Sequence, residues 1–304
     1  MREQFKEIAL SFLVTALLYL SGFFSLWTPL PLFYVGLQKN PFEWRRIFAV
    51  VALLSLILAF SLKTYGILFY LFIAYCLHWG AINRHRIFSW SVLTAFVALF
   101  IIYGIGLLLQ FSGLVDITGR IDAVMNQTVT TLETMSQQPE FQKEGVDVMG
   151  AMEVTKSLFL FLPKLFPAFL FIYTVFVLLV NIAILKAFRR TAPLLLWVED
   201  FRSLQVPVLC LWTSIGAGLI YFANHYLFQF GWLEIALLNI LLVLSFIYLL
   251  QGLAVVSFFL RKVPFFLRLT VYGLLFFFIH ILGLITVGLG LADTWFNFRT
   301  KEKV

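Results

Sequence analysis

Several neutral polar residues lie within long apolar stretches of this sequence, and their side chains could hydrogen-bond a small solute. An amide, hydroxyl or imidazole inside an apolar segment can donate and accept hydrogen bonds without carrying a charge. Two prolines break one stretch and could expose backbone groups. The candidate pocket residues are Thr28, Pro29, Pro31, Asn181, Asn239, Gln251 and His280. The alternative is that these side chains hydrogen-bond one helix to another, which is their commoner role in membranes.

Charged side chains are missing from the centres of the same stretches. Glu234 and Asp293 lie at the ends of apolar stretches, and no acid or base lies at a centre. Ion-coupled transporters usually keep such a residue within the membrane. The motifs H-E-x-x-H, G-x-S-x-G and G-x-x-x-x-G-K-[ST] are also absent, and they mark zinc proteolysis, serine hydrolysis and nucleotide hydrolysis. We therefore expect no ion coupling, no enzyme activity, no metal site and no cofactor.

Long runs without a charged residue must position these side chains. Apolar residues make up 62% of the chain and charged residues 12%, well below the roughly 25% charged residues of soluble domains. In lipid the backbone must satisfy its own hydrogen bonds, so such runs form helices. We predict an all-α polytopic transmembrane bundle, a single membrane domain over residues 1–304. The eight runs cover residues 8–38, 47–62, 64–83, 87–115, 165–185, 203–233, 235–260 and 269–292.

Basic residues concentrate in alternate loops between these runs. By the positive-inside rule these loops are cytoplasmic. They contain Lys39, Arg45, Arg46, Arg84, Arg86, Lys186, Arg189, Arg190, Arg202, Arg261, Lys262 and Arg268. The other loops contain only Lys63, Arg120, Lys143 and Lys156. The net charge of +7 is spread over short loops, so it does not indicate a nucleic-acid partner.

The first run is predicted to be broken at Thr28–Pro31. Eight single crossings would leave Arg2 and the basic tail outside, against the positive-inside rule. A crossing over residues 8–26 followed by a return segment over 30–38 places Arg2 and Lys39 on one side, and the prolines favour this break. The break is then a candidate cavity wall; the alternative is an interfacial turn. In the last run, glycines at 283, 288 and 290 mark a second place for a bend.

One polar segment, residues 112–157, interrupts the runs. Apolar residues recur in it at spacings of three and four, which predicts an amphipathic extramembrane helix that ends at Pro139. They are Ile117, Ile121, Val124, Met125, Leu132 and Met135. This helix could be a lid over an outward-facing pocket, or a loop helix packed for stability.

Four segments carry a resemblance to a known family. They are Thr28–Pro31 before a basic loop, the acidic middle segment, the sequence from Phe201 to Pro207, and the closing sequence from Gly290 to Arg299. With this order of features the chain resembles the YybS-like family of predicted bacterial membrane proteins, a family of unknown function. That family is in turn similar to the substrate-binding subunits of energy-coupling-factor vitamin transporters, which bind a solute and use partner ATPases. Those subunits dock through Ala-x-x-x-Ala, where this chain has Ser11 and Thr15.

Two hypotheses for function follow. In the first, the bundle binds or transports a small neutral solute together with other membrane or ATPase subunits, as the resemblance implies. In the second, it is a non-transporting scaffold or assembly factor that recruits other proteins. Both place the chain in the lipid bilayer of the bacterial cytoplasmic (inner) membrane.

Overall fold

The computed structural model describes residues 2–84, 86–113, 116–136, 154, 157–158, 161–188, 195 and 200–299. Across these residues the chain forms helices and turns without a β-strand, so the predicted all-α class is confirmed. Six helices are long and apolar enough to cross a membrane, and the predicted number of eight membrane runs is not confirmed. The six candidate spans are Pro41–Leu62, Phe88–Phe111, Leu162–Ala187, Val208–Phe228, Gly231–Lys262 and Ile279–Phe296.

The chain divides into two compact units, which are described separately. Unit 1 comprises residues 1–98, 171–211 and 245–304, and unit 2 comprises residues 99–170 and 212–244. Four helices contribute residues to both units. They are α5 (Ile87–Phe111), α8 (Phe166–Ala187), α9 (Val208–Ala223) and α10 (Gly231–Phe259).

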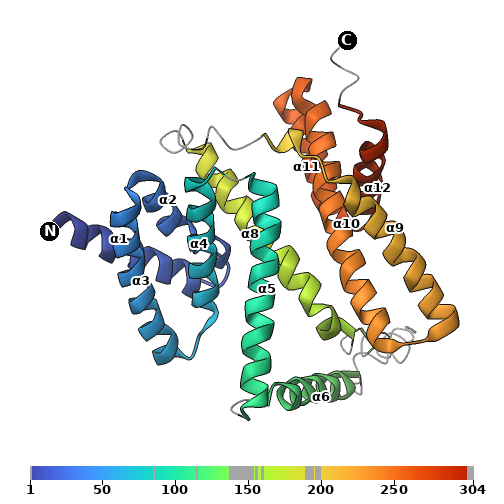
Figure 1. Cartoon of the computed structure of the whole chain (residues 1–304), viewed down its shortest axis with the longest axis horizontal. Coiled ribbons are helices and arrows are strands. Elements are labelled where there is room, and N and C mark those ends of the chain that lie inside the picture. The colour runs from blue at the N-terminus through green and yellow to red at the C-terminus, as the bar shows by residue number, and fades with distance from the viewer. Residues whose placement is uncertain are drawn as a thin grey trace. The chain divides into compact units, whose positions relative to one another are not determined.

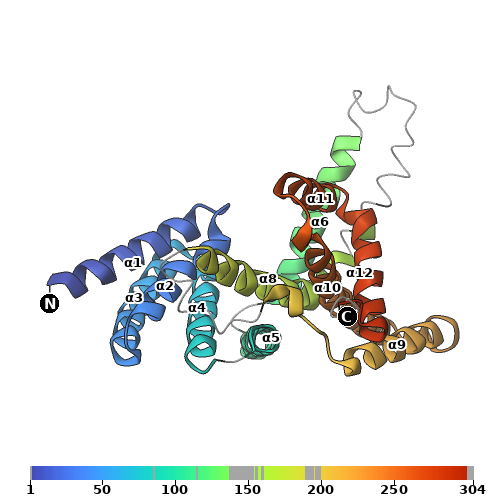
Figure 2. The same ribbon diagram turned by 90° about the horizontal axis from the view of Figure 1, so that it is seen from above.

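The N-terminal part of unit 1 is a cluster of four helices. They are α1 (Arg2–Leu20), α2 (Leu30–Gln38), α3 (Pro41–Leu62) and α4 (Gly66–Ile82). The short α2 packs against α1, α3 and α4, as Figures 1 and 2 show from two directions. Leu32 of α2 is fully buried in a core with Val51 and Leu71. Asn40 caps α3 by accepting a hydrogen bond from the Glu43 N–H at 2.9 Å, as expected of an N-cap residue.

The predicted break in the first run is present. α1 ends at Leu20, earlier than the expected residue 26, because Ser21 bonds to local backbone and Gly22 adopts a left-handed conformation with φ of 66°. The Ser21 Oγ donates to the Leu18 carbonyl at 2.6 Å and accepts from the Phe24 N–H at 3.0 Å. A short 3₁₀ helix, η1 (Ser25–Trp27), leads to α2. The bounds of α2 equal those of the predicted return segment.

The last run is broken too, but away from its glycines. α11 (Phe265–Phe277) ends and α12 (Ile279–Phe296) begins around Phe278, so the bend expected at Gly283, Gly288 or Gly290 is misplaced. Gly290 instead allows close packing against α10: a Cβ atom there would lie 2.1 Å from the Tyr248 carbonyl oxygen. Small residues at such crossings let two helix backbones approach.

Unit 2 contains the helix predicted in the polar segment. α6 (Ile117–Ser136) begins after Asp116, whose carboxylate accepts from the Gly119 N–H at 2.9 Å. Pro139, expected to end this helix, lies outside the described residues. The turn between α9 and α10 is held by Asn224, which is buried and exchanges hydrogen bonds with the Phe230 backbone at 3.0 and 3.1 Å. A short π-helix, η5 (Asn224–Phe228), precedes this turn.

Candidate functional site

The break between α1 and α2 is fastened to one face of α8. The Asn181 side chain is fully buried and donates to the Leu26 carbonyl at 2.8 Å. Two turns earlier on α8, the Tyr173 hydroxyl is hydrogen-bonded to the Tyr70 hydroxyl of α4 and to the Ser25 side chain. Residues eight apart share a helix face. This face of α8 therefore positions the break.

Hydrogen-bonding capacity remains unused beside the break. Thr28 is 1% exposed, and among the described residues neither its hydroxyl nor the Asn181 carbonyl oxygen has a hydrogen-bond partner. Pro29 is buried and Pro31 is half-buried. Buried polar atoms are usually paired with protein or ordered water, because leaving them bare costs free energy. The break thus offers two polar atoms in an apolar setting.

A second packed group in unit 1 surrounds His78 of α4. Its ring stacks on Trp44, with the ring centroids 3.5 Å apart, and is 3% exposed. Gly36 of α2 provides the space for this stack, since a Cβ atom there would lie 2.4 Å from the His78 Nδ1. The Trp44 indole N–H donates to the Leu32 carbonyl at 3.2 Å. This arrangement fixes α2 against α3 and α4.

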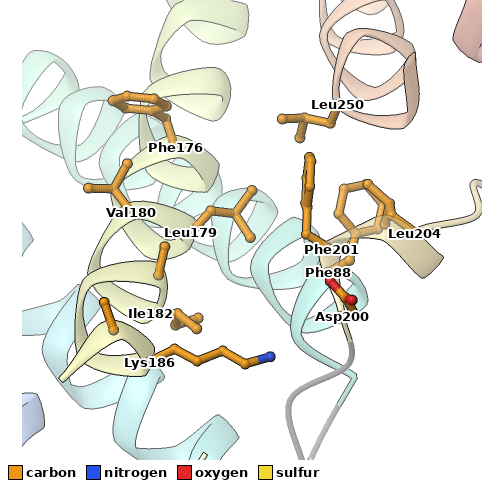
Figure 3. Close-up of a pocket in the computed structure, with 12 residues that line it drawn as sticks. Phe88, Phe176, Leu179, Val180, Ile182, Lys186, Asp200, Phe201, Leu204 and Leu250 are labelled. Carbon is orange, nitrogen blue, oxygen red and sulfur yellow. The ribbon is translucent and has the colours of Figure 1, made fainter. Parts of the chain in front are cut away.

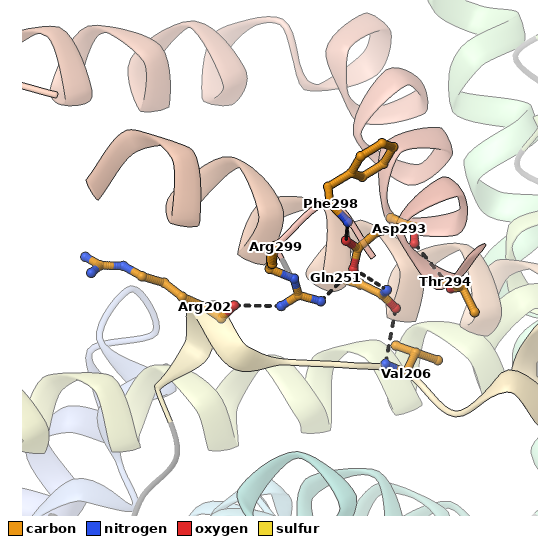
Figure 4. A network of polar contacts seen from close by, with 8 residues as sticks. Arg202, Val206, Gln251, Asp293, Thr294, Phe298 and Arg299 are labelled. Atoms are coloured by element: carbon orange, nitrogen blue, oxygen red, sulfur yellow. Dashed lines mark hydrogen bonds and ion pairs between the residues drawn. The ribbon is translucent and has the colours of Figure 1, made fainter. Parts of the chain in front are cut away.

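A buried ion pair lies at the end of α12 in unit 1, and a hydrogen bond from Gln251 links it to α10. The Asp293 carboxylate, 1% exposed, accepts from the Arg299 guanidinium at 2.6 Å and from the Gln251 amide at 2.9 Å. It also accepts from the Phe298 N–H at 3.1 Å. Figure 4 shows these groups converging on the carboxylate, Gln251 from α10 and the other two from the segment that follows α12. A charge at this depth is tolerated because it is both paired and hydrogen-bonded.

The same ion pair holds the segment that leads into α9. The Arg299 guanidinium donates to the Arg202 carbonyl at 2.6 Å, and the Gln251 side-chain carbonyl accepts from the Val206 N–H at 3.2 Å. The segments Phe201–Pro207 and Gly290–Arg299 were two of the four that carried the family resemblance. The structure brings both to Gln251.

A cavity of about 600 Å³ lies beside this network within unit 1. Its walls are apolar apart from one cation and one acid, and Figure 3 shows the Lys186 side chain extending toward the side where Asp200 lies. The volume is typical of a site for a small molecule. The lining residues are Phe88, Phe176, Leu179, Val180, Ile182, Ala183, Lys186, Ala187, Asp200, Phe201, Leu204 and Leu250.

The DUF2232 family of predicted membrane proteins matches residues 8–294 of the chain. The chain belongs to this family. The match covers the break, the cavity and Asp293, and it confirms the membrane assignment that the apolar runs predicted. No curated protein and no solved structure matches the chain significantly.

The predicted pocket residues of this family member lie in different places. Thr28, Pro29 and Pro31 share the break with Asn181, all in unit 1. Gln251 belongs to the ion-pair network, and His280 is exposed on α12. In unit 2, Asn239 accepts from the Ala168 N–H at 3.0 Å and donates to the Lys164 carbonyl at 2.9 Å. It therefore caps the beginning of α8.

Sequence reasoning missed the cavity, and within the part of the chain that the structure describes none of the seven predicted residues lines it. That reasoning considered polar side chains inside apolar runs, whereas the polar groups of this cavity lie beyond the ends of runs, Lys186 in the last turn of α8 and Asp200 before η4. Lys186 and Asp200 lie at the two ends of one basic loop. A pair of opposite charges at the two ends of a loop is the sequence pattern that could have identified them. Among the described residues, no three His, Cys, Asp or Glu side chains gather closely enough to hold a metal ion.

Proposed function

We propose that this membrane protein binds a small solute of no net charge in the unit 1 cavity and does not transform it chemically. The cavity is the observation that carries the proposal. Its apolar lining suits a solute with an apolar body, and Lys186 and Asp200 supply opposite charges that suit one polar end. A solute with net charge would leave one of these two groups facing a like charge.

We further propose that the solute passes to or from partner subunits in the bacterial cytoplasmic membrane. This step is supported only by the resemblance to the substrate-binding subunits of energy-coupling-factor transporters, which work with ATPases. The unused polar atoms at the break, on Thr28 and Asn181, lie buried elsewhere in unit 1 and do not line this cavity.

The test fills the cavity and measures what the protein retains. Full-length protein is purified gently into nanodiscs, and bound small molecules are identified by native mass spectrometry. Ala183→Trp and Leu179→Trp place an indole in the cavity, and we expect either change to abolish the co-purified solute. Leu219→Trp, at an exposed position on α9, is the matched control and keeps it.

The outcome separates the two hypotheses for function. Retention of the solute by a folded Ala183→Trp variant would exclude the cavity as its site. A stoichiometric partner protein without any small molecule would instead support the scaffold hypothesis.

A further inference from the structure

Residues 200–206, the strap, form one wall of the cavity. Asp200, Phe201 and Leu204 line it, and the strap leads into α9. Its only helical part is η4 (Phe201–Ser203), a single 3₁₀ turn capped by the Asp200 carboxylate at 3.2 Å from the Arg202 N–H. A wall of this kind has little intrinsic rigidity, because one helical turn is not stable alone. Its position must come from outside contacts.

One such contact joins the Arg202 Nε to the Ser257 hydroxyl of α10 at 3.4 Å, and two shorter ones come from the buried network around Gln251. The Arg299 guanidinium holds the Arg202 carbonyl at 2.6 Å, near the beginning of the strap. The Gln251 side chain holds the Val206 N–H at 3.2 Å, at its end. The bond from Arg299 is charge-assisted, and such bonds are short and strong, whereas the bond to Gln251 joins two neutral groups. Both holding groups are bonded to a single acceptor, Asp293.

We propose that Asp293, Gln251 and Arg299 form a clasp that positions the strap as the cavity wall. The clasp controls solute retention without touching the solute, and in this respect it rests on the proposed function. Asp293 orients both partners: its carboxylate fixes the guanidinium that reaches Arg202 and the amide that reaches Val206. Without the Asp293 carboxylate, Arg299 is a buried cation with one backbone partner. The contacts that hold the strap in position are then weakened.

The close contact between α10 and α12 makes the clasp possible. A Cβ atom on Gly252 would lie 1.9 Å from the Thr286 carbonyl oxygen, so the two backbones touch next to Gln251. This proximity brings the amide within reach of Asp293. The glycines set the distance between the helices, and the clasp uses it.

The experiment measures how often the strap moves away from its position, by the rate at which a buried cysteine on the strap becomes accessible to a labelling reagent. In full-length protein with Cys76→Ala and Cys210→Ala, Val206→Cys replaces a side chain that is 5% exposed, and its labelling by a maleimide is timed in nanodiscs. We expect Asp293→Asn to raise the labelling rate at least tenfold, and Arg299→Gln to do the same. Glu234→Gln, a partly exposed carboxylate changed in the same way, leaves the rate within twofold.

Two further reporters separate local release from general loosening. Ser203→Cys, exposed on the strap, is labelled quickly in every background, and Val51→Cys, fully buried in α3, stays slow in the Asp293→Asn protein. Unchanged slow labelling of Val206→Cys in a folded Asp293→Asn or Arg299→Gln protein would overturn the clasp. So would equal acceleration at Val51→Cys.

Solute retention is read in parallel, so the two proposals fail separately. Loss of the solute in Asp293→Asn together with faster labelling is the expected result. Faster labelling in a protein that never retains a solute leaves the clasp standing and refutes the cavity as a binding site. Slow labelling with the solute retained refutes the clasp alone.

Discussion

Asp293 is the residue whose role differs most from its sequence context. It lies at the end of an apolar run, yet it is 1% exposed and accepts hydrogen bonds from Gln251, Phe298 and Arg299. Buried ion pairs contribute little net stability when complete, but removing one partner is costly because the other charge stays buried. The contrast between a complete and a broken pair is therefore the informative measurement.

We predict that Asp293→Asn lowers the free energy of unfolding by about 3–5 kcal/mol, since Arg299 then lacks its counter-charge. Replacing both partners, as Asp293→Leu with Arg299→Met, is expected to cost less than either single change. Reversible denaturation in detergent measures both. The control is Glu7→Gln, because Glu7 pairs with Lys39 at 2.9 Å with both side chains partly exposed, and such a pair is worth only about 0–1 kcal/mol. Equal losses at Asp293 and Glu7 would contradict the prediction.

At the scale of elements, the crossing of α10 and α12 depends on glycine. Gly252 and Gly290 each lie so near the opposite helix that a Cβ atom would fall 1.9 or 2.1 Å from a backbone oxygen. A backbone cannot rotate away as a side chain can. Any substitution must separate the two helices or shift one along the other.

We predict that Gly252→Ala destabilises the protein by about 1–3 kcal/mol, the usual cost of overpacking. Gly290→Ala should behave in the same way, and either change should also speed labelling of Val206→Cys. Gly288→Ala on the same helix is the matched control, since nothing lies within 4 Å of its Cβ position. It should be neutral or stabilising by up to about 1 kcal/mol through helix propensity. Thermal unfolding of the three variants measures these changes in stability. A loss of stability in Gly288→Ala as large as that in Gly252→Ala would contradict the prediction that the α10–α12 crossing depends on glycine.

Elements were easier to predict than the site, for a physical reason. Apolar runs and prolines act locally, so the runs, the break at Thr28–Pro31 and the bounds of α2 could be found from the sequence. The break at Phe278 has no such local signal, because neither proline nor glycine lies there. The network depends on long-range pairing of Gln251 with Asp293 and of Arg299 with Arg202, which a single sequence does not contain.

At the scale of the molecule, the two ends of the chain come to the predicted cytoplasmic loops of unit 1. Glu7 of α1 pairs with Lys39. At the other end, Arg299 donates to the Arg202 carbonyl, and the Arg202 Nε lies 3.4 Å from the Ser257 hydroxyl, one turn before the basic residues that close α10. Both ends therefore meet loops that the positive-inside rule places in the cytoplasm.

The helix lengths agree with this placement. α11 has 13 residues and extends about 20 Å at 1.5 Å per residue, too short for a hydrocarbon core of about 30 Å. It begins beside Arg268, which donates to the Arg261 carbonyl at 3.1 Å, and α12 ends near Arg202. We therefore predict that the last run enters and leaves the membrane on one side, as we predict for the first run through α1 and α2. On this prediction the chain crosses the membrane through α3, α4, α5, α8, α9 and α10. The shorter α4 then crosses, and α12, which is one of the six candidate spans by length, does not.

We predict that both ends of the chain are cytoplasmic. A fluorescent protein that folds only in the cytoplasm should be bright when fused before Met1 or after Val304. An alkaline phosphatase active only outside should work when inserted after Thr64 or within residues 112–157, and should be inactive at either end. Active phosphatase at the C-terminal fusion would mean that α11 and α12 cross the membrane as one span. In that case Arg299 could not contact the Arg202 loop, and the ion pair with Asp293 would have to form on the opposite side from the strap.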